Sequence, residues 1–198
     1  MANITIVVDV LNGFCKAGNL ASPRCDAAIP RIRDLIDERR RAGDQLIFLA
    51  DTHDPNDREF EVFPVHCVRG TKEADVVEEL QPFLKDATLI RKRRYSGFFE
   101  TNLDELLKAA RPEQVTVIGV CTDICVLHTV ADLRNRDYRV WCRRRPSRLS
   151  MRPGIPATRY RSGRSRTSRA CSAPESFRHR TPPASGRVGA RRPTRAAL

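Results

Sequence analysis

QVTVIGVCTDICVLHTVADLRNR, residues 114–136, contains a strand, a turn and a helix in direct succession. Its first part, 114–120, is an apolar run rich in Val and Ile, which is typical of a buried strand. Four residues later, apolar side chains recur with helical spacing over 124–136. A strand that leads directly into a helix is the repeating unit of α/β proteins with a parallel sheet.

The same alternation continues on both sides of this stretch. Further strands are expected at 4–9, 45–50, 88–92 and 139–141, and further helices at 27–42, 73–84 and 103–110. We therefore expect one α/β domain over residues 1–142, with a parallel sheet and helices on both faces.

Charge divides the chain at the end of this domain. Residues 1–142 carry 20 Lys+Arg and 23 Asp+Glu, whereas residues 143–198 carry 16 Arg and one acid, and the whole chain has a formal net charge of +12. The Arg/Pro/Ser-rich segment lacks apolar periodicity and cannot bury enough surface to offset its ordering entropy. It is either a disordered basic tail that binds nucleic acid non-specifically, or the product of a reading-frame shift. We favour the frame shift, because wrong-frame GC-rich DNA tends to encode Arg, Pro, Ala, Gly and Ser.

Composition also limits the compartment. No segment approaches the roughly 20 apolar residues of a membrane span, and no basic region precedes the first strand as in a signal peptide. The seven cysteines are odd in number and include no Cys-x-x-Cys pair, so free thiols in a reducing cytoplasm are expected.

Cys125 stands where the turn after strand 114–120 enters its helix. Asp123 is expected to cap that helix. A cysteine in the first helical turn is close to unpaired N–H groups and to the positive end of the dipole, which favour a thiolate. Those N–H groups can also form an oxyanion hole. The alternative is a buried structural cysteine, the usual fate of a free thiol.

Two further polar residues follow predicted strands. Asp9 ends the first strand, at the sheet edge where α/β proteins bind ligands. The alternative for Asp9 is a turn-capping role before Asn12 and Gly13. Lys92 ends the strand 88–92, although a lysine in a basic run is by itself typical of a solvated surface.

Three motifs in order resemble the nicotinamidase/isochorismatase-like family of cysteine hydrolases across residues 4–141. They are VDVLNGFC at 8–15, KRRYSGF at 92–98 followed by TNL at 101–103, and GVCTDICV at 119–126. The resemblance implies an isochorismatase-like, Rossmann-like fold and a catalytic triad of Asp9, Lys92 and Cys125. It also implies a cis peptide between Val120 and Cys121, with the N–H groups of Cys121 and Cys125 facing the oxyanion.

The chemistry that the resemblance implies is acyl transfer through a thioester. Asp9 takes the thiol proton and later delivers it to the departing amine. Lys92 holds the Asp9 carboxylate and favours the thiolate by charge. Relatives continue with one more strand and helix, which the Arg-rich segment cannot supply, so we expect this chain to lack them.

A candidate metal site follows the second strand. Asp51, His53 and His66 offer a carboxylate and two imidazoles, which suit zinc, iron or manganese, although such loop residues are often only solvated. Similarity to nicotinamidases implies a divalent metal, with zinc preferred, that holds the pyridine nitrogen of the substrate. Glu59 is expected as the fourth ligand, with Glu61 as second choice. By the same resemblance, Phe14 and Leu20 are expected to line the ring pocket.

Several functions stay open from the sequence. The first is hydrolysis of nicotinamide to nicotinate and ammonia, with a small-molecule amide as the partner and no membrane partner. The second is a related amidase that acts on a ureido or carbamoyl substrate. An isochorismatase proper would replace the nucleophile, so Cys125 argues against it. The last is an inactive product that carries a basic nucleic-acid-binding tail. Similarity to the family also implies a homo-oligomer.

Overall fold

A computed structural model of the protein describes residues 3–142, which form a five-stranded parallel sheet in the order β3-β2-β1-β4-β5. The segment 143–198, expected to be a tail or a frame-shift product, lies outside the described residues. The strands are β1 (Ile4–Val8), β2 (Gln45–Asp51), β3 (Ala87–Lys92), β4 (Val115–Gly119) and β5 (Val140–Cys142). The α-helices are α1 (Asn12–Cys15), α2 (Pro23–Asp26), α3 (Ile29–Arg41), α4 (Leu103–Ala110) and α5 (Cys125–Asn135).

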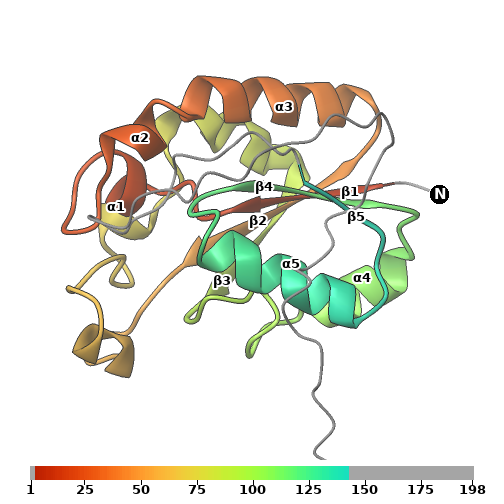
Figure 1. Cartoon of the computed structure of the whole chain (residues 1–198). Coiled ribbons are helices and arrows are strands. Elements are labelled where there is room, and N and C mark those ends of the chain that lie inside the picture. Colours follow the sequence, from red (N-terminus) through yellow and green to blue (C-terminus); the bar gives the residue numbers. More distant parts are fainter. Residues whose placement is uncertain (1–2, 143–198) are drawn as a thin grey trace, which may run out of the picture.

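Helices cover both faces of the sheet, as expected for an α/β protein (Figure 1). α3 packs on one face, where its residues Ile32 and Ile36 join the first hydrophobic cluster. α4 and α5 pack on the other face, where Leu107 and Leu133 join the second cluster. Every residue of β1 is buried because both of its faces are covered, which explains its unbroken apolar sequence.

One predicted helix is wrong. Residues 73–84 do not form an α-helix but fall into two 3₁₀ helices, η2 (Lys72–Ala74) and η3 (Glu78–Asp86). Pro82 lies inside η3 and lacks the N–H group that an α-helix would use. The apolar pattern still predicted which side chains are buried, because Leu80 and Phe83 lie in the first hydrophobic cluster.

The sheet brings the ends of four strands to one edge. Val8 is in register with Leu49 of β2 and with Gly119 of β4, and Asp51 of β2 pairs with Lys92 of β3. Gly119 has φ +135°, and a Cβ there would lie 2.1 Å from the carbonyl oxygen of Val8. Only glycine therefore lets β4 approach β1 this closely before the chain turns toward α5.

Within residues 3–142, the helices are all too short or too polar to cross a lipid bilayer.

Candidate active site

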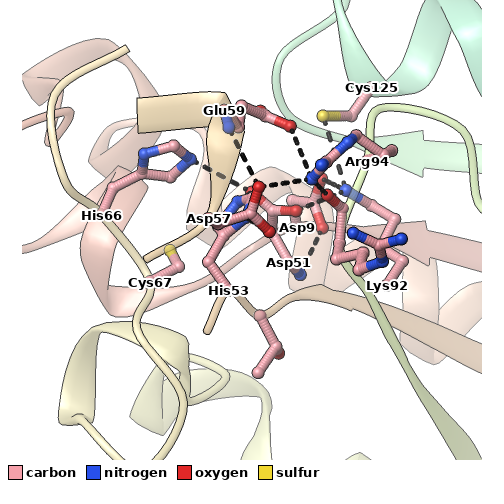
Figure 2. Close-up of polar contacts among 12 residues, drawn as sticks. Asp9, Asp51, His53, Asp57, Glu59, His66, Cys67, Lys92, Arg94 and Cys125 are labelled. Atoms are coloured by element: carbon pink, nitrogen blue, oxygen red, sulfur yellow. Dashed lines mark hydrogen bonds and ion pairs between the residues drawn. The ribbon is translucent and has the colours of Figure 1, made fainter. Parts of the chain in front are cut away.

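The three residues expected to form the triad come together at the carboxyl edge of the sheet (Figure 2). Asp9 directly follows β1, Lys92 is the last residue of β3, and Cys125 is the first residue of α5. The Lys92 Nζ lies 2.8 Å from Asp9 Oδ2 and 3.6 Å from Cys125 Sγ. All three side chains are buried, which excludes the solvated surface position that a basic run suggests for Lys92.

Burial dominates the electrostatics of this group. It raises the pKa of Asp9 to about 6, with the charge of Lys92 opposing and that of Asp51 adding to the shift. Burial also raises the pKa of the Cys125 thiol well above its ordinary value, again against the charge of Lys92. Burial alone would lower the pKa of Lys92, but the charges of Asp9, Cys125 and Asp51 raise it well above its ordinary value.

Burial thus opposes the preference for a thiolate that the helix start and Lys92 provide at Cys125. The helix start and Lys92 do not outweigh the loss of solvation at a side chain that is only 8% exposed. The arrangement instead offers a protonated thiol close to a carboxylate whose pKa suits a general base. It can move the thiol proton to Asp9 during attack on a substrate.

The turn that carries the thiol has the expected cis peptide between Val120 and Cys121. The carbonyl of Cys121 accepts hydrogen bonds from the N–H groups of Ile124 and Val126, at 3.1 and 3.3 Å. The predicted cap is wrong: α5 begins after Ile124 without a side-chain cap, and Asp123 Oδ1 has no hydrogen-bond partner among the described residues. The turn is shaped by backbone contacts instead.

Beside the triad lies a cluster of four buried donors, Asp51, His53, Glu59 and His66, whose ligand atoms all lie within 4.8 Å of one another. Asp51 Oδ2 is 3.0 Å from Nε2 of His53 and 3.3 Å from Nε2 of His66. Glu59 Oε2 is buried and accepts no hydrogen bond within the described chain. Two carboxylates and two imidazoles, with one buried carboxylate oxygen that accepts no hydrogen bond in the described chain, fit a divalent cation such as zinc.

The structure distinguishes the two candidates for the fourth ligand. Glu59 lies in the 3₁₀ helix η1 (Arg58–Glu61) and is 8% exposed. Glu61 is exposed on the same helix and pairs with Arg58 at 3.7 Å. Glu59, the first choice from the sequence, therefore faces the cluster, and Glu61 does not.

One pocket is lined both by Cys125 of the triad and by Asp51, Glu59 and His66 of the cluster of metal-type donors. Phe14 and Leu20 line it, as the sequence predicted. Phe63, Tyr95 and Ile124 also line it and were missed. Tyr95 stands within the motif after Lys92, so its place was indicated, whereas nothing in the sequence marked Phe63 or Ile124 as pocket residues. The full lining is Phe14, Leu20, Asp51, Glu59, Phe63, His66, Tyr95, Val120, Cys121, Ile124 and Cys125.

His128 lies outside the triad. Its ring is exposed on α5, where Nδ1 donates to the carbonyl oxygen of Ile124 at 2.7 Å. The ring also packs beside Tyr95, with centroids 5.2 Å apart.

A buried thiol, carboxylate and ammonium at the carboxyl edge of a parallel sheet define an α/β cysteine hydrolase. The chain belongs to the isochorismatase family, since the model of the Isochorismatase domain matches residues 3–144. Its relatives include a nicotinamidase of Acinetobacter baylyi, 33% identical, with 64% of this chain and 72% of that protein covered. The protein is thus a hydrolase that acts on amides.

Two solved structures show the same fold. The N-carbamoylsarcosine amidase of Thermoplasma acidophilum is 35% identical with a TM-score of 0.67, covering 72% of this chain and 81% of that one. The pyrazinamidase of Pyrococcus horikoshii, solved in complex with zinc, is 29% identical with a TM-score of 0.63, covering 72% of this chain and 83% of that one.

Proposed function

We propose that this protein hydrolyses nicotinamide to nicotinate and ammonia through a thioester on Cys125. The observation that carries the proposal is that one pocket contains both the thiol and three of the four metal-type donors, Asp51, Glu59 and His66. A divalent cation bound there would supply a Lewis acid that holds a pyridine nitrogen. Similarity to a nicotinamidase and to a zinc-containing pyrazinamidase supports this assignment.

Acylation follows from the positions of the triad. The Cys125 sulfur attacks the amide carbon while its proton moves to Asp9, which Lys92 holds by the 2.8 Å ion pair. The N–H groups of Cys121 and Cys125 are expected to stabilise the tetrahedral oxyanion. The C–N bond then breaks, and the proton on Asp9 passes to the leaving nitrogen, which departs as ammonia.

Deacylation uses the same groups in the same order. Asp9 takes a proton from a water molecule, and the hydroxide oxygen attacks the thioester carbon. The C–S bond breaks, the product acid leaves, and the proton on Asp9 returns to Cys125. Lys92 keeps its charge throughout and holds the Asp9 carboxylate in place.

A second candidate is hydrolysis of a ureido or carbamoyl amide. Similarity to the N-carbamoylsarcosine amidase favours it, and the triad would serve that substrate equally well. The walls of the pocket favour the first candidate, because Phe14, Phe63 and Tyr95 offer aromatic surface to a flat ring.

The test compares ammonia release by the full-length protein from nicotinamide and from N-carbamoylsarcosine, together with the metal content of the purified protein. Cys125→Ala should abolish release, whereas Cys15→Ala, which removes a buried thiol away from the pocket, should retain it. Equal rates for wild type and Cys125→Ala would eliminate the thioester. Release from the carbamoyl substrate alone would select the second candidate, and no release from either would favour an inactive product.

We also propose a cytoplasmic location for the enzyme. Five of the six cysteines in the described part of the chain, Cys15, Cys25, Cys67, Cys121 and Cys125, are free thiols, which suits a reducing compartment. The homo-oligomer that the family resemblance implies is tested by size-exclusion chromatography with light scattering.

A further inference from the structure

Asp57 lies beside the cluster of Asp51, His53, Glu59 and His66 and contacts two of its four members (Figure 2). Its Oδ2 is 3.2 Å from Nδ1 of His53, and its Oδ1 accepts the N–H of Glu59 at 2.9 Å. The Asp57 side chain is only 3% exposed, and it is absent from the pocket wall. A buried carboxylate that touches neither the pocket nor the triad is not used by the proposed reaction.

Arg94 holds Asp57 in this position. Its Nη1 lies 2.7 Å from Asp57 Oδ1 and 3.6 Å from Glu59 Oε2. The guanidinium thus compensates the charge of two buried carboxylates that would otherwise repel each other. Arg94 comes from the loop after β3, so the contact also ties this loop to the segment that carries Glu59.

The two histidines of the cluster are oriented by different means. His66 donates from Nδ1 to the carbonyl oxygen of Pro64 at 2.7 Å, a contact within its own loop. His53 instead depends on a side chain, because its Nδ1 faces Asp57 while its Nε2 faces Asp51. A carboxylate at Nδ1 fixes the proton there and leaves the Nε2 lone pair for a metal ion.

We propose that Asp57 is a positioning residue of the metal site, which orients His53 through Nδ1 and holds Glu59 through its backbone N–H. The proposal rests on the metal site of the proposed function. Asp57 contacts no substrate or reacting atom, so it acts only through these two ligands.

A purely structural role for Asp57 has to be separated from this one. Asp57 is also the N-cap of η1, since its side chain accepts the N–H of Glu59. Serine caps helices about as well as aspartate, but its shorter hydroxyl cannot reach His53. Asp57→Ser therefore keeps the cap and removes the contact to the His53 imidazole together with the ion pair to Arg94. The matched control is Asp54→Ser, because Asp54 lies on the same loop, is exposed and pairs with Arg69.

The experiment measures zinc affinity of full-length protein after metal removal, by competition with a chromophoric chelator. We expect Asp57→Ser to weaken zinc binding about 10- to 100-fold, the usual cost of losing such a partner. Asp54→Ser should bind as wild type does. The zinc affinity of Asp57→Asn, which offers one acceptor oxygen in place of two, should lie between the affinities of Asp57→Ser and Asp54→Ser. Saturating zinc should restore the KM and kcat of Asp57→Ser, because the site itself remains.

The outcomes separate this proposal from the one on which it rests. A wild-type protein that binds zinc and an Asp57→Ser variant that binds it equally tightly would overturn the positioning role alone. Weakened binding together with a melting temperature of the metal-free variant far below that of wild type would also overturn it, in favour of a structural role. A wild-type protein that binds no zinc, iron or manganese would overturn the metal site and the positioning role together.

Discussion

Replacement of Lys92 by methionine removes the ammonium that lies between two buried carboxylates. Lys92 is 2% exposed, and its Nζ lies 2.8 Å from Asp9 and 3.1 Å from Asp51. Methionine has a similar length and fills the same space. Removing one partner of a buried ion pair costs about 3–5 kcal/mol of stability. We therefore expect Lys92→Met to lower the free energy of unfolding of the metal-free protein by about 4 kcal/mol near neutral pH.

The loss should depend on pH in a defined direction. With Lys92 present, burial already raises the pKa of Asp9 from 3.8 to about 6, and without Lys92 it rises further. A carboxyl with a raised pKa binds more protons in the folded state, so folding becomes less favourable as pH rises toward that pKa. The difference in the free energy of unfolding between wild type and Lys92→Met is therefore largest at alkaline pH and becomes smaller as pH falls toward 6.

Denaturant unfolding at pH 8 and pH 6 measures this loss, and ammonia release measures activity. Lys85→Met is the control, because Lys85 is exposed on η3. Activity of Lys92→Met should fall by at least about 100-fold, the lower range of what a well-placed general base contributes. The reasoning fails if the variant unfolds within about 0.5 kcal/mol of wild type at pH 8, as a surface substitution would.

Three further predictions concern the turn, the base and the metal. Gly119→Ala should lower the free energy of unfolding by more than about 3 kcal/mol, because its Cβ would lie 2.1 Å from a backbone oxygen. The control Gly43→Ala, with no described atom within 4 Å, should lower it by only about 1–2 kcal/mol through left-handed strain. Equal losses for the two variants in urea unfolding would contradict the close approach. The kcat/KM should fall tenfold per pH unit below about 6, since Asp9 must be ionised to take the thiol proton; a flat profile from pH 5 to 7 would count against Asp9 as the base. Stripping the metal with a chelator should abolish ammonia release and leave the circular dichroism unchanged, and zinc should restore the rate; full activity of metal-free protein would refute the role of the cluster.

Strong local patterns predicted most of the fold. The expected helix at 103–110 coincides with α4, Leu103–Ala110, and the apolar run at 45–50 matches β2 to within one residue. The failure at 73–84 has a physical cause, since apolar spacing reports which side chains are buried and not which helix type buries them. A proline and short polar turns favour 3₁₀ geometry there, while Leu80 and Phe83 still reach the core.

The candidate site was predicted in its members but not in its electrostatics. Asp9, Lys92 and Cys125 were identified as a triad through the resemblance of their motifs to the family, and the position of Asp9 at the carboxyl end of a predicted strand agreed with it. The direction in which the pKa of Cys125 is shifted was not predicted, because it depends on how deeply several segments bury the sulfur. Asp57 was missed for a related reason. In the sequence it is one more acid in a polar loop, and only the fold places it against His53 and Arg94.

Asp51 belongs to both halves of the site. Its Oδ1 lies 3.1 Å from Lys92 Nζ, its Oδ2 lies 3.0 Å from His53 Nε2, and its backbone N–H donates to Asp9 Oδ1 at 2.9 Å. The same residue therefore fixes the general base, shares the charge of the triad lysine and offers an oxygen to a metal ion. Because Asp51 ends β2 between β1 and β3, the strand order alone places it between the other two carboxyl-edge residues. The sheet thereby fixes the Asp51 end of the cluster relative to the triad, whereas Glu59 and His66 reach the cluster from the segment between β2 and β3.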